Sequence, residues 1–332
     1  MIKLGNLSAS LRQWLMSTLQ LGPGIGDVHY LVEDASAFHV RLLDSRIDSA
    51  HIHTSLVAGE DALVTNRNDV LLAFPGTYTE TAKTTWDKSS THLIGLGGPI
   101  QRTPAVAGTK GAVYFTSTTV GLTELLLISG HYNQFHGFGA YLPVAAGVAT
   151  INIQGRVNRL KDLYIRDGDN ATQLASGVLG YALQIDPSAS GYGNNNLIED
   201  CHIGESRNTT RTAGGQILFG LTGVAAAGQQ NEFKRCFIQG RAETAGCYAV
   251  KVSGNACVDR HILWEDCVFY NFWENLANTL LTVFSDDCGS THLHMLTGKT
   301  AQYGFTAWGE TTYAFAAMPI PNSAGGKMLV VT

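Results

Sequence analysis

Short apolar runs separated by glycine and other turn residues dominate the chain from residue 69 onward. The run at 70–74 ends at Pro75-Gly76, strand-like sequence resumes at 77–80, and a further run at 92–96 ends at Gly97-Gly98. Runs of this length with glycine punctuation predict β-strands, and helical periodicity is scarce in this part of the chain. The pattern therefore predicts an all-β solenoid built from short strands.

One eight-residue motif recurs four times in the second half of the chain. Its copies are 158–165 (NRLKDLYI), 196–203 (NLIEDCHI), 231–238 (NEFKRCFI) and 262–269 (ILWEDCVF). A second strand is predicted upstream of three copies, at 182–186, 217–220 and 249–252. Glycine- and asparagine-rich loops of variable length complete each period, and repeats of about 20–50 residues with such inserts indicate stacked coils.

The order of residues inside the motif indicates how each coil turns. A large apolar residue at the third position is followed by two more, three and five positions later. Because side chains alternate between the two faces of a strand, all three can point inward only if the chain bends between them. The bend falls at Asp162, Asp200, Arg235 and Asp266, and we expect these to form an external ladder in which Arg235 lies between two aspartates.

The two ends of the chain have different patterns. Leucines at helical spacing in 7–21 predict a short N-terminal helix that caps the solenoid, and a weaker helical pattern runs from about 47 to 64. A strand is predicted at 28–32 between them. The strand-like tail 327–332 is expected to cover the other end or to add a strand to a neighbour. These patterns divide the chain into a cap and docking region (1–68), a parallel β-helix (69–295) and a strand-rich tail or subunit-contact segment (296–332).

The motif N-x-Φ-x-D-C-x-Φ, preceded by NDVLLAFPGTYTE at 68–80, resembles the pectate-lyase-like superfamily of right-handed parallel β-helices. The resemblance covers about 69–289, and the segments 65–80 and 92–98 look most like β-helix proteins of phage structural genes. It implies an all-β, right-handed parallel β-helix. It leaves the activity open, because this scaffold carries lyases, hydrolases, epimerases, adhesins and phage virion proteins.

Composition narrows the classes of partner. Charged residues make up 15% of the chain and the formal net charge is −5, so no basic stripe is present for phosphate binding and no nucleic-acid partner is expected. The N-terminus lacks the uninterrupted apolar core of a secretory signal, and no segment approaches the roughly 20 apolar residues of a membrane span. We therefore expect a protein made in the cytoplasm of a host, without a membrane partner.

Three of the six cysteines occupy one position of the motif. Cys201, Cys236 and Cys267 are interpreted as a buried, reduced core ladder that packs as small apolar side chains. The other three, Cys247, Cys257 and Cys288, have no repeat partner and no assignment. The cysteines show neither CxxC nor zinc-type spacing, and we expect no metal and no cofactor.

Asp286 and Asp287 are the best candidates for catalytic carboxylates, because polysaccharide hydrolases of this scaffold pair aspartates as acid and base. Adjacent strand residues point to opposite faces, however, and no glycine-flanked histidine or arginine–lysine pair accompanies them. Other titratable pairs have ordinary structural interpretations, since each lacks further ligands for a metal. They are Glu199-Asp200, Glu265-Asp266, His131 with His136, and His292 with His294.

Four aromatic residues crowd into one short segment, at Phe269, Tyr270, Phe272 and Trp273. Some of them must point outward, where aromatic side chains serve either subunit packing or sugar stacking. We favour subunit contact, because 303–318 is also aromatic and poor in charge.

Together these patterns favour a non-catalytic structural or decorating protein on a bacteriophage virion, at the surface of the capsid or the tail. Its expected partners are other virion proteins and copies of itself, for example in a homotrimer. Two alternatives stay open. One is a polysaccharide lyase or glycoside hydrolase of β-helix type, and the other is an adhesin that binds a host surface glycan without cleaving it.

Overall fold

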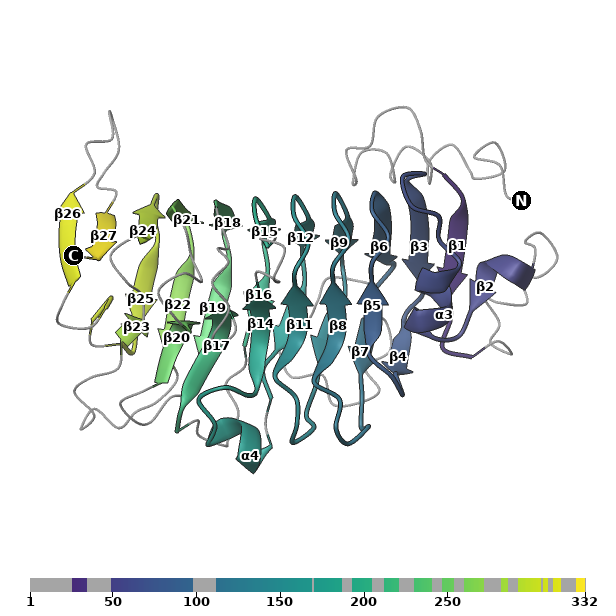
Figure 1. Cartoon of the computed structure of the whole chain (residues 1–332), viewed down its shortest axis with the longest axis horizontal. Coiled ribbons are helices and arrows are strands. Elements are labelled where there is room, and N and C mark those ends of the chain that lie inside the picture. The colour runs from purple at the N-terminus through teal and green to yellow at the C-terminus, as the bar shows by residue number, and fades with distance from the viewer. Residues whose placement is uncertain are drawn as a thin grey trace.

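The computed structural model describes residues 26–34, 49–97, 112–168, 170–186, 193–204, 212–220, 230–240, 247–253, 260–271, 282–285, 292–305, 307–309, 313–317 and 327–331. Successive strands wind around one long axis, with β1 (Val28–Leu31) near one end and β26 (Tyr313–Ala317) at the other (Figure 1). Neighbouring coils pair in parallel along all three sides, and the predicted parallel β-helix is confirmed.

Three sheets form the sides of the solenoid. Sheet A contains, in spatial order, β2 (Ile52–His53), β1 (Val28–Leu31), β3 (Asp69–Ala73), β6 (Thr91–Gly95), β9 (Gln134–His136), β12 (Arg159–Lys161), β15 (Leu197–Glu199), β18 (Asn231–Lys234), β21 (Arg260–Glu265), β24 (His292–Thr297), β27 (Lys327–Val331) and β26 (Tyr313–Ala317). Sheet B contains β25 (Ala301–Tyr303), β22 (Val268–Asn271), β19 (Phe237–Gly240), β16 (His202–Ile203), β13 (Tyr164–Arg166), β10 (Gly139–Tyr141), β7 (Val113–Thr116) and β4 (Gly76–Thr79). Sheet C contains β23 (Thr282–Phe284), β20 (Cys247–Val252), β17 (Gly214–Phe219), β14 (Tyr181–Ile185), β11 (Ala149–Ile153), β8 (Glu124–Ile128) and β5 (Thr84–Trp86). A coil such as β12, β13 and β14 visits the three sheets in turn.

Each copy of the sequence motif lies in one coil of the solenoid. Leu160 pairs with Ile198, Ile198 with Phe233, and Phe233 with Trp264, as the gapless alignment requires. All four side chains are fully buried, and the rings of Phe233 and Trp264 stack with centroids 4.2 Å apart. The core is therefore a continuous stack along the axis, in which each strand pairs with the strands of the adjacent coils.

The bend between sheets A and B lies at the predicted polar residues. Asp162, Asp200, Arg235 and Asp266 have φ of 51°, 55°, 52° and 55°, which is the left-handed region. This conformation reverses the face of the following residues in a single step, so that Cys201 and Ile203 follow Ile198 into the core. Two-residue corners of this kind leave the length variation to the other two corners of the coil.

An asparagine ladder joins the coils where the chain enters sheet A. The Oδ1 atom of each asparagine accepts a hydrogen bond from the backbone N–H of the asparagine in the preceding coil. Asn158 Oδ1 accepts from Asn133 (3.0 Å), Asn196 Oδ1 from Asn158 (2.9 Å) and Asn231 Oδ1 from Asn196 (3.0 Å). These asparagines are almost completely buried. Asn133 thus begins a further coil, 133–140, that the sequence alignment did not include.

The N-terminal part differs from its predicted pattern. The helix predicted at 7–21 lies outside the described residues. The prediction of a single weak helix from about 47 to 64 is wrong. This segment forms η2 (Ser49–His51), the strand β2 and α3 (Leu56–Asp61), because residues 52–53 pair with β1. Sheet A therefore starts upstream of residue 69, while the strand predicted at 28–32 is present as β1.

The C-terminal tail closes the end of sheet A within its own chain. β27 pairs antiparallel with β24 on one side and with β26 on the other. This change from parallel to antiparallel pairing matches the first of the two expected roles of the tail, covering the end. The helices in the described residues are η2, α3 and α4 (Ala171–Leu174), and none has the length or apolar character to span a membrane.

Candidate functional site

Charged side chains on the outer face of sheet A form the most extensive polar cluster around the repeat motifs. One row runs through His136, Lys161, Glu199, Lys234 and Glu265, which pair with each other from coil to coil. We call this row, together with the side chains that bind it, the charge ladder. The additional members are Arg159, Asp162, Asp200, Glu232 and Arg235.

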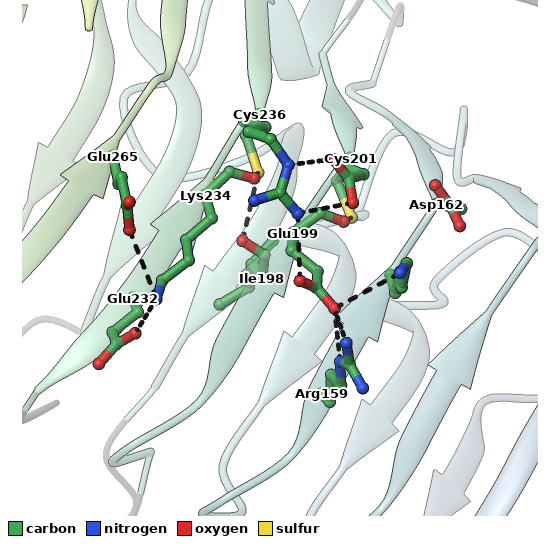
Figure 2. A network of polar contacts seen from close by, with 12 residues as sticks. Arg159, Asp162, Ile198, Glu199, Cys201, Glu232, Lys234, Cys236 and Glu265 are labelled. Carbon is green, nitrogen blue, oxygen red and sulfur yellow. Dashed lines mark hydrogen bonds and ion pairs between the residues drawn. The ribbon is translucent and has the colours of Figure 1, made fainter. Parts of the chain in front are cut away.

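Glu199 lies at the centre of the charge ladder. Its carboxylate accepts hydrogen bonds from the Arg159 guanidinium of the preceding coil and from Arg235 Nη2 of the following coil, the latter at 3.3 Å (Figure 2). Lys161 Nζ lies 4.0 Å away on the preceding coil. The Glu199 side chain is only 8% exposed as a result. One carboxylate therefore joins three consecutive coils.

Arg235 also binds Asp200, the bend residue of the preceding coil. Its Nε and Nη2 atoms donate to the two carboxylate oxygens of Asp200 at 2.7 and 2.9 Å. This bidentate hydrogen bonding lowers the pKa of Asp200 and raises the pKa of Arg235 above its ordinary value. The expected place of Arg235 between two aspartates is only half met, because the carboxylate of Asp266 instead accepts the backbone N–H of Lys299 at 2.6 Å.

Lys234 continues the alternation of sign toward the C-terminal end. Its Nζ lies 3.0 Å from Glu232 and 3.4 Å from Glu265, so it neutralises carboxylates of its own and the next coil (Figure 2). Hydrogen bonding to Glu232 is the main cause that raises the pKa of Lys234. In the charge ladder, Arg159, Arg235 and Lys234 thus each form an ion pair with a carboxylate.

The histidine pairs named from the sequence bind separate partners. His136 Nε2 lies 2.6 Å from the Asp162 carboxylate, whereas His131 Nδ1 accepts the backbone N–H of Arg156 at 3.2 Å. His294 is buried and stacks on Phe284 with ring centroids 4.1 Å apart. Among the residues that the structure describes, no group of three or more histidine, cysteine, aspartate or glutamate side chains could hold a metal.

The three repeated cysteines lie in the core. Cys201, Cys236 and Cys267 are at most 2% exposed, are not disulfide-bonded, and their Sγ atoms contact backbone carbonyls. Burial raises the pKa of Cys236 and Cys267 well above the ordinary value of a thiol. Cys247 is also buried and packs against Phe305, while Cys257 and Cys288 lie outside the described residues.

The aromatic segment separates into inward and outward positions. Phe269 is fully buried and packs edge-on against Trp264, so the expectation that it contacts another subunit is wrong. It follows the bend by three residues, which is an inward position of the motif. Tyr270 is half-buried on the outer face of sheet B. Phe272 and Trp273, like the candidate acids Asp286 and Asp287, lie outside the described residues.

A row of rings along sheet B was missed in the sequence. Tyr164, His202 and Phe237 pair from coil to coil, with ring centroids 4.9 and 5.1 Å apart, and Tyr270 lies 5.9 Å from Phe237. We call these four side chains the aromatic row. The signal was present, because the first three occupy the seventh position of the motif, between two inward residues.

No protein-family model and no curated protein matches this sequence. Among solved structures, the pectin methylesterase PemA from Erwinia chrysanthemi is similar, with a TM-score of 0.51 at 10% identity over 93% of this chain and 86% of that chain. The chain has a right-handed parallel β-helix fold. This β-helix is also similar to ORF18 of Geobacillus virus E2, with a TM-score of 0.46 at 15% identity over 95% of the chain.

The same comparison includes a rhamnogalacturonan lyase, with a TM-score of 0.48 at 15% identity over 84% of this chain and 63% of that chain. The match to the phage protein spans 64% of the length of the phage protein. At these identities the likeness establishes the fold alone.

Proposed function

We propose that this β-helix is a non-catalytic structural protein of a bacteriophage particle, exposed on the capsid or the tail. The observation that carries the proposal is the charge ladder, whose carboxylates are bound by basic groups of adjacent coils. Glu199, Asp200 and Glu265 each contact an arginine or a lysine. Charges arranged in this way stiffen the stack of coils, which suits a rod that must keep its shape outside a cell.

Enzymatic cleavage of a polysaccharide would make different demands on these side chains. A glycosidase holds two carboxyl groups about 5–9.5 Å apart on either side of the bond, with one of them protonated. In the charge ladder, Arg235 lowers the pKa of Asp200 and so keeps that carboxyl group ionised. Asp200 is therefore unsuited to act as the general acid of such a pair, and the candidate acids Asp286 and Asp287 lie outside the described residues. The phage attribution is supported by the sequence resemblance at 65–98.

The proposal is tested on purified particles and on the purified protein. We expect peptides of the chain in particles from the lysate, together with surface labelling by an antibody. We expect no new reducing ends when the protein is incubated with pectin, alginate or host capsular polysaccharide. Its absence from particles, combined with cleavage that disappears in Asp286→Asn or Asp287→Asn, would establish the enzyme instead.

The aromatic row favours glycan binding without cleavage as a second candidate. Phe237 and Tyr270 are half-buried on the outer face of sheet B, and flat aromatic faces of this kind can stack on sugar rings. Binding of an oligosaccharide that weakens in Phe237→Ala, with the oligosaccharide recovered intact, is the expected result for an adhesin. The homotrimer is tested separately by light scattering of the purified protein.

A further inference from the structure

Three polar side chains are buried side by side on the outer face of sheet C. Asn152 of β11 pairs with Gln184 of β14, and Asp186 follows Gln184 by two residues. Their chain neighbours, such as Ile153 and Ile185, belong to the core, so the three polar side chains point away from it. Even so, they are only 2%, 1% and 6% exposed.

Each of the three side chains has an oxygen atom without a donor. Among the residues that the structure describes, nothing donates a hydrogen bond to Asn152 Oδ1, Gln184 Oε1 or Asp186 Oδ1. The orientation of two groups is fixed by other contacts, since Gln184 Nε2 donates to the Gly220 carbonyl and Gln154 Nε2 donates to Asp186 Oδ2, both at 3.2 Å. An unsatisfied buried acceptor is unfavourable, so three together call for a bound partner.

The charge at this place is also uncompensated. Burial raises the pKa of Asp186, and the nearby carboxylate of Glu124 raises it further, while only the Gln154 and Asn152 side chains act in the opposite direction. In the part of the chain that the structure describes, no lysine or arginine is among the groups that shift its pKa. A buried carboxylate is costly unless a cation or a proton neutralises it.

We propose that Asn152 Oδ1, Gln184 Oε1 and Asp186 Oδ1 bind a hard metal cation, with Ca²⁺ as the best fit. The donor set consists of oxygen alone, and neutral amide oxygens beside a carboxylate are ligands that Ca²⁺ accepts, with water completing its six to eight positions. A site with a single carboxylate is weak, with an expected Kd of about 10⁻⁴–10⁻³ M.

The cation would link the coil of β11 to the coil of β14 across sheet C. Amide and carboxylate ligands on neighbouring strands can do this because they lie in register, as Asn152 and Gln184 do. The inference does not depend on the proposed function, since a cation between two coils would stabilise a structural rod and an enzyme alike. Protons compete for Asp186, so the affinity should fall as the pH is lowered.

The test is a calorimetric titration of Ca²⁺ into the EDTA-treated, dialysed full chain, together with its thermal unfolding. We expect saturable heat and a rise in Tm of about 2 °C when Ca²⁺ exceeds the Kd tenfold, compared with NaCl of equal ionic strength. Asp186→Asn preserves the shape and removes the charge, and it should abolish both responses. Asp87→Asn is the matched control, because its side chain is 67% exposed and it should respond like the wild type.

Two results would overturn the proposal. One is the absence of heat and of a Tm shift in the wild-type protein at pH 7, which would leave a proton or a water molecule as the partner of these oxygens. The other is an unchanged Ca²⁺ response in Asp186→Asn. If Asp186→Asn does not fold, Gln184→Met replaces it and should weaken binding at least about tenfold or remove it, and lowering the pH should weaken the binding of Ca²⁺ by the wild-type protein.

Discussion

Removing one member of the asparagine ladder should destabilise the β-helix by an amount that follows from its hydrogen bonds. Asn196 Oδ1 accepts the backbone N–H of Asn158 at 2.9 Å, and Asn196 Nδ2 donates to the Gly155 carbonyl at 3.2 Å. In Asn196→Ala both of these buried groups lose their side-chain partner. At about 1–2 kcal/mol for each orphaned group, the free energy of unfolding should fall by about 2–4 kcal/mol.

Hydrogen exchange gives the most direct assay, because it reads individual amides. The Asn158 amide should exchange much faster in Asn196→Ala, with smaller changes one coil further away, since the strand pairing joins adjacent coils. Urea denaturation gives the total loss of stability. A loss below about 0.5 kcal/mol together with a still-protected Asn158 amide would refute the argument that the ladder satisfies buried backbone groups.

Pairs of substitutions provide the internal control. Asn196 Nδ2 also lies 3.1 Å from Asn231 Oδ1, so the double variant of these two residues should depart from additivity by about 0.5–1 kcal/mol. Two ladder members, Asn158 and Asn196, separate Asn133 from Asn231, and the effects of replacing Asn133 and Asn231 should add within about 0.5 kcal/mol.

Three other measurements test separate parts of the structure. Burial, with repulsion from neighbouring histidines in the case of His29, lowers the pKa of His29 and His92 to about 4, so the unfolded chain binds more protons between pH 6.5 and 4. The contribution of these two histidines to the free energy of unfolding should be fully present above pH 6.5 and should fall by up to ~3 kcal/mol per histidine as the pH drops toward 4. A pH profile that is equally flat in the wild type and in the His29→Phe/His92→Phe variant would contradict this. Cys236 should resist alkylation in the folded protein, and its rapid modification, measured by peptide mass spectrometry, would place it outside the core. Arg235→Ala should lower the free energy of unfolding by about 1 kcal/mol, because the side chain is half-exposed, and the loss should be smaller at high salt. An equal loss in an Asp200→Asn background would argue against an ion pair between Arg235 and Asp200.

The fold could be predicted because the repeat motif carries its own geometry. A bend at Asp162 and its equivalents reconciles the parity of the inward residues, and the structure forms this bend with a left-handed φ near 50° at those positions. The same reasoning failed where only one copy of a pattern was available. The weak helix at 47–64 had no second copy against which to test it, and pairing with β1 outweighed its helical propensity.

The site was harder to predict because it depends on which residues meet across coils. The Glu199-Asp200 pair could be named from the sequence, but its neighbours Arg159 and Arg235 lie 40 and 36 residues away along the chain. The unpaired oxygen atoms on sheet C had no sequence signal at all. Asn152 and Gln184 belong to strands outside the motif alignment, and nothing in the sequence marks these two polar residues as buried.

Stacking in register has a consequence for how such a chain can change in length. Each coil adds one strand to each of three sheets, and adjacent strands lie about 4.8 Å apart. A duplicated coil would therefore lengthen the rod by that step while creating only contacts of types already present. The antiparallel strands β27 and β26 set one limit, because a coil inserted beyond them would meet strands running in the wrong direction. Growth by duplication is thus confined to the parallel part, and the closing strands are carried along unchanged at the tip.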